Sequence, residues 1–210
     1  MIAVIADDFT GAAEIGGLGL LYGYKTAIVT EVKALENIDL LIIVTEMRAF
    51  DSEKAVQESE KITKELLKLN PEFIYKKIDS VLRGNIGVEI KAQLKASEKS
   101  RALVIPANPI LNRIINNGIY YIDGKPLIES KFANDLVFKA KSSKVLDIIG
   151  RIDDLSITSV SYNGKLPEKG LLIGNTLNMN ELKEWVKKID VETLPCGGAR
   201  KMNKVIKSVF

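Results

Sequence analysis

Residues 2–12 read IAVIADDFTGA, and this stretch decides the fold. An apolar run from Ile2 to Ala6, rich in β-branched residues, leads into two aspartates and a Thr-Gly pair. A segment of mostly small and apolar residues then runs from Ala12 to Leu21. The order predicts a buried strand, a polar loop and a helix.

The same alternation continues along the chain. Helical patterns begin at Asp51 and Gly87, and apolar strand-like runs occupy residues 25–30, 39–45, 73–78 and 102–105. Strands that are apolar along their whole length favour a parallel sheet that is covered on both sides. We therefore predict an α/β fold: a doubly wound, mostly parallel sheet with helices on both faces.

The second half of the chain has a looser pattern. The sequence predicts a hairpin at 119–128 that turns at Asp123-Gly124. Helices are expected at 143–150 and 179–189, and short strands at 156–162 and 170–173. Because no linker, repeat or low-complexity segment interrupts this order, we expect one domain over residues 1–210.

Composition excludes several kinds of chemistry. The chain has 30 basic and 27 acidic residues and no histidine, and Cys196 is its single cysteine. The absence of histidine removes Ser-His-Asp catalysis and His-ligated zinc, and one cysteine excludes an internal disulfide. The small charge surplus argues against nucleic-acid binding. With no secretory leader and no apolar run long enough to cross a membrane, a cytoplasmic protein without a membrane partner is expected.

Polar residues follow the ends of the predicted strands. Asp7 and Asp8 follow the first, Glu46 and Arg48 the third, Asp79 and Ser80 the fourth, and Asn108 the fifth. In open α/β sheets, ligands bind at the carboxyl ends of the strands. These residues are therefore expected at one edge of the sheet.

The first motif, ADDFTGA at 6–12, places Asp7, Asp8 and Thr10 beside Gly11. Its carboxylates suit hydrogen bonds from a polyol, a magnesium ion held through water, or a proton from an attacking hydroxyl. The alternative is that Asp8 or Thr10 only caps the next helix.

The second motif is KKIDSVLRGN at 76–85. Lys77 and Arg83 suit a carboxylate or phosphate, and Ser80 suits a hydroxyl. The alternative is an ion-paired corner in which Asp79 neutralises Lys77 or Arg83.

The third motif, PANPILNR at 106–113, offers Asn108 and Arg113 on a loop stiffened by prolines, or simply a stiff exposed loop. The glycines at 16–19 do not complete a dinucleotide fingerprint, and no G-x-x-x-x-G-K-[ST] phosphate loop occurs. These absences argue against a Rossmann-type oxidoreductase.

Taken in order, the motifs resemble the N-terminal domain of the four-carbon acid sugar kinase family, whose members phosphorylate threonate, erythronate or 3-oxo-tetronate. The resemblance covers roughly residues 1–175 and includes GIYYIDGKPLIESKFAND at 118–135 and SKVLDII at 143–149. It departs from the family at Val81, Ile110 and Leu111, where aliphatic residues stand at positions that are usually not aliphatic.

The resemblance implies a domain that binds a small sugar acid. By position in the family's motifs, Asp8 or Asp79 orients or deprotonates the attacking hydroxyl. The substrate-binding residues that it implies are Asp7, Thr10, Arg48, Lys77, Ser80, Arg83, Asn108 and Arg113.

In the family, ATP belongs to a C-terminal domain. We expect that domain to be absent from residues 1–210, so no cofactor or metal is expected in this chain, and ATP and magnesium only with the other domain. A separate nucleotide-binding chain and a homo-oligomer are compatible with the sequence. The competing hypothesis is a non-catalytic module that binds a sugar acid or another small anion.

Overall fold

The computed structural model describes residues 1–134 and 140–199. Its main feature is an eight-stranded sheet in the order β2-β3-β1-β4-β11-β5-β10-β9, in which every pair of neighbours is parallel. The strands are β1 (Ile2–Ala6), β2 (Thr26–Val29), β3 (Leu40–Val44), β4 (Phe73–Lys77), β5 (Arg101–Ile105), β9 (Ile157–Val160), β10 (Gly170–Gly174) and β11 (Thr193–Gly197).

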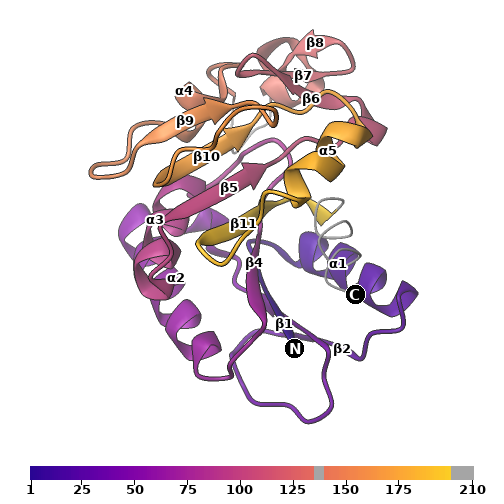
Figure 1. The fold of residues 1–210 in the computed structure, drawn as a ribbon, viewed down its shortest axis with the longest axis vertical. Helices are drawn as coiled ribbons and strands as arrows, with labels where there is room; N and C mark the ends of the chain where they lie inside the picture. Colours follow the sequence, from indigo (N-terminus) through magenta and orange to yellow (C-terminus); the bar gives the residue numbers. More distant parts are fainter. Residues whose placement is uncertain (135–139, 200–210) are drawn as a thin grey trace.

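Helices cover both faces of this sheet (Figure 1). One face carries α1 (Phe9–Leu21) and α5 (Met179–Val186), and the other carries α2 (Ser52–Leu67), α3 (Ile86–Ser97) and the short α4 (Val145–Ile149). Alternate residues of β1 serve the two sides, because Ala3 and Ile5 pack toward α2 and α3 while Val4 packs toward α1. The predicted doubly wound α/β fold is confirmed.

A small antiparallel sheet lies beside the β9 end of the large one (Figure 1). It is formed by β6 (Arg113–Asn116), β7 (Ile119–Ile122) and β8 (Lys125–Pro126). The predicted turn at Asp123-Gly124 joins β7 to β8, and both residues have positive φ, at 51° and 78°. The preceding hairpin turns at Asn117-Gly118 in the same conformation, which the sequence prediction did not use.

Strand β11 was missed in the sequence and lies at the centre of the sheet, between β4 and β5. Its sequence, TLPCG, contains a proline and a glycine, which are both poor strand residues. All five of its residues are buried. Tertiary burial therefore outweighs local propensity here.

The helix predicted at 143–150 is present but short, since α4 has only five residues, Val145–Ile149. The expectation of one domain over residues 1–210 stays a prediction. Within the described ranges, no helix combines the length and the apolar character that crossing a bilayer requires.

Candidate functional site

The strand-end residues meet in a polar pocket of about 200 Å³ at the carboxyl edge of the large sheet. The start of α1, the loop after β4, the segment between β5 and β6, and residues 198–199 after β11 form its walls. Eight of the ten predicted site residues line it: Asp8, Thr10, Lys77, Asp79, Ser80, Arg83, Asn108 and Arg113. Asp7 and Arg48 do not line it but lie in contact with residues that do.

Arg48 connects three carboxylates beside the pocket. It stands in a short 3₁₀ turn, Met47–Ala49, after β3. Its Nη2 lies 2.8 Å from Asp7 Oδ2, 3.1 Å from Asp8 Oδ2 and 3.5 Å from Asp79 Oδ1. The positive charge of Arg48 is therefore already shared among protein carboxylates.

Asp7 is buried, with 3% of its surface exposed. Burial raises the pKa of its carboxyl group, against the opposing charges of Lys76, Arg48 and Lys77. Its Oδ2 accepts two hydrogen bonds from Arg48, while its buried Oδ1 has no hydrogen-bond partner in the described part of the chain. Asp7 thus fixes the position of Arg48 and does not itself line the pocket.

Asp79 forms the ion-paired corner that the sequence offered as an alternative. Arg83 binds it through two hydrogen bonds, from Nε at 2.9 Å and from Nη2 at 2.8 Å. The backbone N–H groups of Val81 and Arg83 also donate to Oδ2, each at 3.1 Å. Burial alone raises the pKa of Asp79, but the hydrogen bonds and charges of Arg83 and Arg48 outweigh it and leave the pKa lowered.

Asp8 has two contacts that leave it at the pocket wall. Its Oδ1 accepts the backbone N–H of Gly11 at 2.8 Å, so the residue caps α1 as the alternative reading proposed. Its Oδ2 faces Arg48, and 31% of the side chain stays exposed. Capping and lining the pocket are therefore compatible for this residue.

Two of the predicted cations have no carboxylate partner among the described residues. Lys77 donates from Nζ to the carbonyl oxygen of Ile78 at 3.0 Å, and an ammonium group carries three donors. Arg113 donates from Nη1 to Ser80 Oγ and lies over the ring of Phe132, 5.0 Å from its centre. Lys77 and Arg113 therefore differ from Arg48 and Arg83, which are both paired with carboxylates.

The remaining polar lining comes from both sides of the pocket. Thr10 is exposed on the first turn of α1, and Asn108 exchanges two backbone hydrogen bonds with Arg113, at 2.8 and 3.1 Å. The side-chain Oδ1 of Asn108 is buried and has no hydrogen-bond partner within the described ranges. An amide in this state suits a ligand hydroxyl.

Two residues at the site were missed in the sequence. Glu14 lines the pocket one turn after Thr10. Tyr120 is buried beneath the loop after β4 and donates from its hydroxyl to the carbonyl of Ser80. Burial raises the pKa of this tyrosine, so it stays a neutral donor. Glu14 could have been predicted, because it lies four residues after Thr10 and residues four apart share a helix face. No pattern in the sequence around Tyr120 predicts its contact with the loop after β4.

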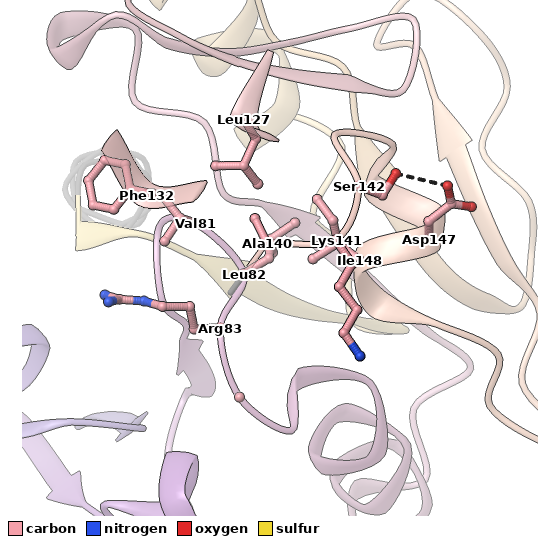
Figure 2. A pocket seen from close by; sticks show the side chains of 11 residues that line it. Val81, Leu82, Arg83, Leu127, Phe132, Ala140, Lys141, Ser142, Asp147 and Ile148 are labelled. Atoms are coloured by element: carbon pink, nitrogen blue, oxygen red, sulfur yellow. Dashed lines mark hydrogen bonds between the residues drawn. The ribbon is translucent and has the colours of Figure 1, made fainter. Parts of the chain in front are cut away.

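A second cavity, of about 210 Å³, adjoins the polar pocket at Arg83, and its character is different. Figure 2 shows Leu82, Leu127, Ala140 and Ile148 grouped together, while the Arg83 guanidinium points away from them. Ser142 donates to Asp147 at 2.9 Å beside them. This cavity thus combines apolar side chains with Lys141, Ser142 and Asp147, whereas eight of the ten predicted site residues line the polar pocket.

The chemistry of the pocket follows from the groups that line it. Over residues 1–134 and 140–199, no group of three or more His, Cys, Asp or Glu side chains gathers as metal ligands would. The sequence has no glycine-rich phosphate loop of the P-loop type. The pocket presents two cations, Lys77 and Arg113, the carboxylate of Asp8, which caps α1, and several hydroxyl and amide groups.

Several curated proteins are similar to this chain in sequence. D-threonate kinase of Salmonella typhimurium is 32% identical over 160 residues, which cover 75% of this chain and 38% of the relative. D-erythronate kinase of Heliobacterium modesticaldum is 34% identical over 199 residues, covering 90% and 44%. 3-Oxo-tetronate kinase of Brucella melitensis is 32% identical over 171 residues, covering 76% and 39%. The chain spans less than half the length of these relatives.

Solved structures share the fold. A protein of Haemophilus influenzae superposes with a TM-score of 0.88 at 20% identity, over 99% of this chain and 56% of that one. A domain of unknown function from Bordetella bronchiseptica superposes with a TM-score of 0.84 at 22% identity, over 97% and 55%. That protein was crystallised with bound citrate as a domain-swapped dimer.

The family relationship rests on most of the chain. The sequence profile described as the sugar-binding N-terminal domain matches residues 2–190, which include every strand-end residue of the polar pocket up to Arg113. The three curated relatives described above are named as kinases of four-carbon sugar acids, and this chain covers only their N-terminal part. This chain therefore belongs to the family of sugar-binding N-terminal domains that is found in the four-carbon acid sugar kinases.

Proposed function

We propose that this chain is the substrate-binding part of an ATP-dependent four-carbon sugar acid kinase, and that its polar pocket binds an acid of the threonate or erythronate type. The observation that carries the proposal is a pair of cations, Lys77 and Arg113, that have no carboxylate partner among the described residues and lie in one pocket with a partly exposed carboxylate, Asp8. An acid with one carboxylate and several hydroxyl groups requires a cation to bind the carboxylate and hydrogen-bonding side chains to bind the hydroxyls.

Each side chain receives a role from its contacts. Arg113, which lies over the Phe132 ring and donates to the Ser80 hydroxyl, binds the substrate carboxylate. Asn108 and Thr10 bind substrate hydroxyls. Lys77 on the pocket floor neutralises charge that develops during phosphoryl transfer, a reaction that depends mainly on positioning and charge stabilisation.

Asp8 is the better candidate for the carboxylate that orients or deprotonates the attacking hydroxyl. Asp79 receives four hydrogen bonds from Arg83 and Val81 and has a lowered pKa, so it is a poor proton acceptor. We assign Asp79, with Asp7 and Arg48, to holding the loop after β4 and the start of α1 in place.

Phosphoryl transfer itself is assigned to the combination of this chain with a nucleotide-binding domain, in the same or another polypeptide. What supports this assignment is that the matched relatives, D-threonate kinase and D-erythronate kinase, are more than twice as long as the segment matched here. We propose that residues 1–210 bind the acid but do not phosphorylate it alone.

Calorimetry with D-threonate and D-erythronate tests the binding proposal. The wild-type chain is expected to bind at least one of them saturably, and Arg113→Gln to bind it at least about tenfold more weakly. Arg151→Gln is the matched control, because this side chain is 93% exposed and does not line the pocket. The absence of binding by the wild type to any four-carbon acid would refute the proposal.

A coupled kinase assay separates the kinase from a non-catalytic module. The exposed aliphatic residues Ile110 and Leu111 at the pocket rim motivate the second possibility. The chain alone is expected to show no turnover, and turnover is expected once the C-terminal part of D-erythronate kinase is supplied. Turnover by the chain alone would contradict the two-part assignment, whereas intact binding that is never converted to turnover would favour the module.

A further inference from the structure

The charges of the polar pocket are not evenly distributed. Asp8 and Glu14 both come from the start of α1, which follows β1. Asn108 and Arg113 come from the segment after β5. Because β4 and β11 lie between β1 and β5 in the sheet, these two groups stand on opposite sides of the pocket. The α1 wall carries the carboxylates of Asp8 and Glu14, with the Lys77 ammonium close to Gly11 beside them, and the wall next to β5 carries Arg113.

Glu14 is a free carboxylate on the α1 wall. It is exposed, and within the described ranges no hydrogen bond or ion pair occupies its oxygens. Asp8, the N-cap residue of the same helix, is engaged by the Gly11 backbone and by Arg48. Glu14 is therefore the carboxylate of this wall that keeps its full hydrogen-bonding capacity for a ligand.

Arg113 is its counterpart across the pocket. The hydroxyl of Ser80 occupies one of its guanidinium nitrogens, and no carboxylate of the described chain lies within 4 Å of it. A ligand carboxylate placed here meets Arg113 without a neighbouring carboxylate, whereas the same group placed against α1 meets Glu14 and Asp8 as well as Lys77.

Building on the proposed function, we propose that this polarity sets both the direction and the charge of the ligand. The pocket takes a monocarboxylic polyhydroxy acid with its carboxylate on Arg113 and its terminal hydroxyl against Glu14 and Asp8. Glu14 is the specificity-determining residue: it accepts a hydrogen bond from a terminal CH₂OH and repels a terminal carboxylate. Dicarboxylates of the same carbon skeleton are thereby excluded.

One pair of ligands isolates this effect. D-Threonate and the tartrate produced by oxidising its terminal CH₂OH differ only in the group that would face Glu14. The wild-type chain is expected to bind D-threonate at least about tenfold more tightly than that tartrate, because the second carboxylate of tartrate is repelled by Glu14 and Asp8 and loses the hydrogen bond that the CH₂OH group donates. Both dissociation constants are measured by calorimetry at one pH and ionic strength.

The Glu14→Gln variant tests the residue itself. It keeps the shape and the hydrogen bond to a hydroxyl but removes the charge, so the ratio of the two dissociation constants is expected to fall by about fivefold or more, mainly through tighter tartrate binding. Arg113→Gln is expected to weaken both acids while the threonate-to-tartrate preference stays. Glu36→Gln, on an exposed residue outside the pocket, is the charge-matched control.

The outcomes distinguish this inference from the proposed function. If the wild type binds D-threonate but Glu14→Gln leaves the preference over tartrate unchanged, the role of Glu14 is refuted while the proposed function stands. If Glu36→Gln changes the preference as much as Glu14→Gln does, the effect is one of net charge and the inference also fails. If the wild type binds neither acid, the proposed function is refuted, and the inference falls with it.

Discussion

Nη2 of Arg48 lies 2.8 Å from Oδ2 of Asp7, and this contact joins a buried carboxylate to the polar pocket 41 residues away in the sequence. The same guanidinium reaches Asp8 and Asp79, which do line the pocket. The geometry of the pocket wall therefore depends on an ion pair that a ligand does not touch.

Removing Arg48 is expected to destabilise the fold strongly. Arg48→Met leaves Asp7 buried without its partner, which costs about 3–5 kcal/mol in comparable buried pairs. The double variant Asp7→Asn/Arg48→Met is expected to recover much of that loss, since no uncompensated charge remains. Urea unfolding of both variants measures it, and a single variant as stable as the wild type would contradict the assigned role.

Gly11 is expected to control ligand binding through Lys77. A Cβ at position 11 would lie 2.5 Å from Lys77 Nζ and 2.6 Å from Asp8 Oδ1, so Gly11→Ala must displace the end of the lysine side chain. We expect at least about tenfold weaker binding of the acid, with little loss of stability because a flexible side chain can move. Calorimetry combined with a melting curve separates the two effects.

Gly17 provides the matched control on the same helix. A Cβ there would meet nothing within 4 Å, and the residue is exposed. Gly17→Ala is expected to raise stability by about 0.5–1 kcal/mol through helix propensity and to leave binding unchanged. Equal loss of binding in both variants would mean that Lys77 is not the cause.

The ion pair between Lys76 and Glu89 is buried between β4 and α3, with at most 2% of either side chain exposed. Lys76→Met or Glu89→Gln alone is expected to cost about 3–5 kcal/mol, because each leaves one buried charge unpaired. Lys76→Met/Glu89→Leu is expected to be markedly more stable than either single variant. A double-mutant cycle measures this coupling, and additive losses would rule it out.

Asp79 is expected to contribute to stability in a pH-dependent way. Its pKa is lowered in the folded protein, so its contribution is complete above the unfolded value of about 3.9 and is lost as the pH falls below that value toward the folded pKa. The stability difference between wild type and Asp79→Asn is therefore expected to shrink between about pH 6 and about pH 3. A constant difference across that range in urea unfolding would contradict the lowered pKa.

The candidate site could be located from the sequence because its position follows from topology. Parallel strands bring their carboxyl ends to one edge of a sheet, so the sequence predicts that Asp8, Asp79 and Asn108 lie close together. Glu14 was missed because an exposed glutamate on a helix reads as an ordinary solvated residue. Strand β11 was missed because Pro195 and Gly197 weaken the local strand signal, and only burial between β4 and β5 specifies it.

The sequence by itself determined the alternating α/β architecture, the edge of the sheet that carries the polar residues, and the family. These properties depend on periodicity and on residue order, which are local. Tertiary structure decided which cations are available: over the described ranges, Arg48 and Arg83 are paired with carboxylates, whereas Lys77 and Arg113 are not. The Asp79–Arg83 pair is local in sequence, but the pairs of Arg48 join side chains that are tens of residues apart, and these distances are set only when the strands and loops have packed.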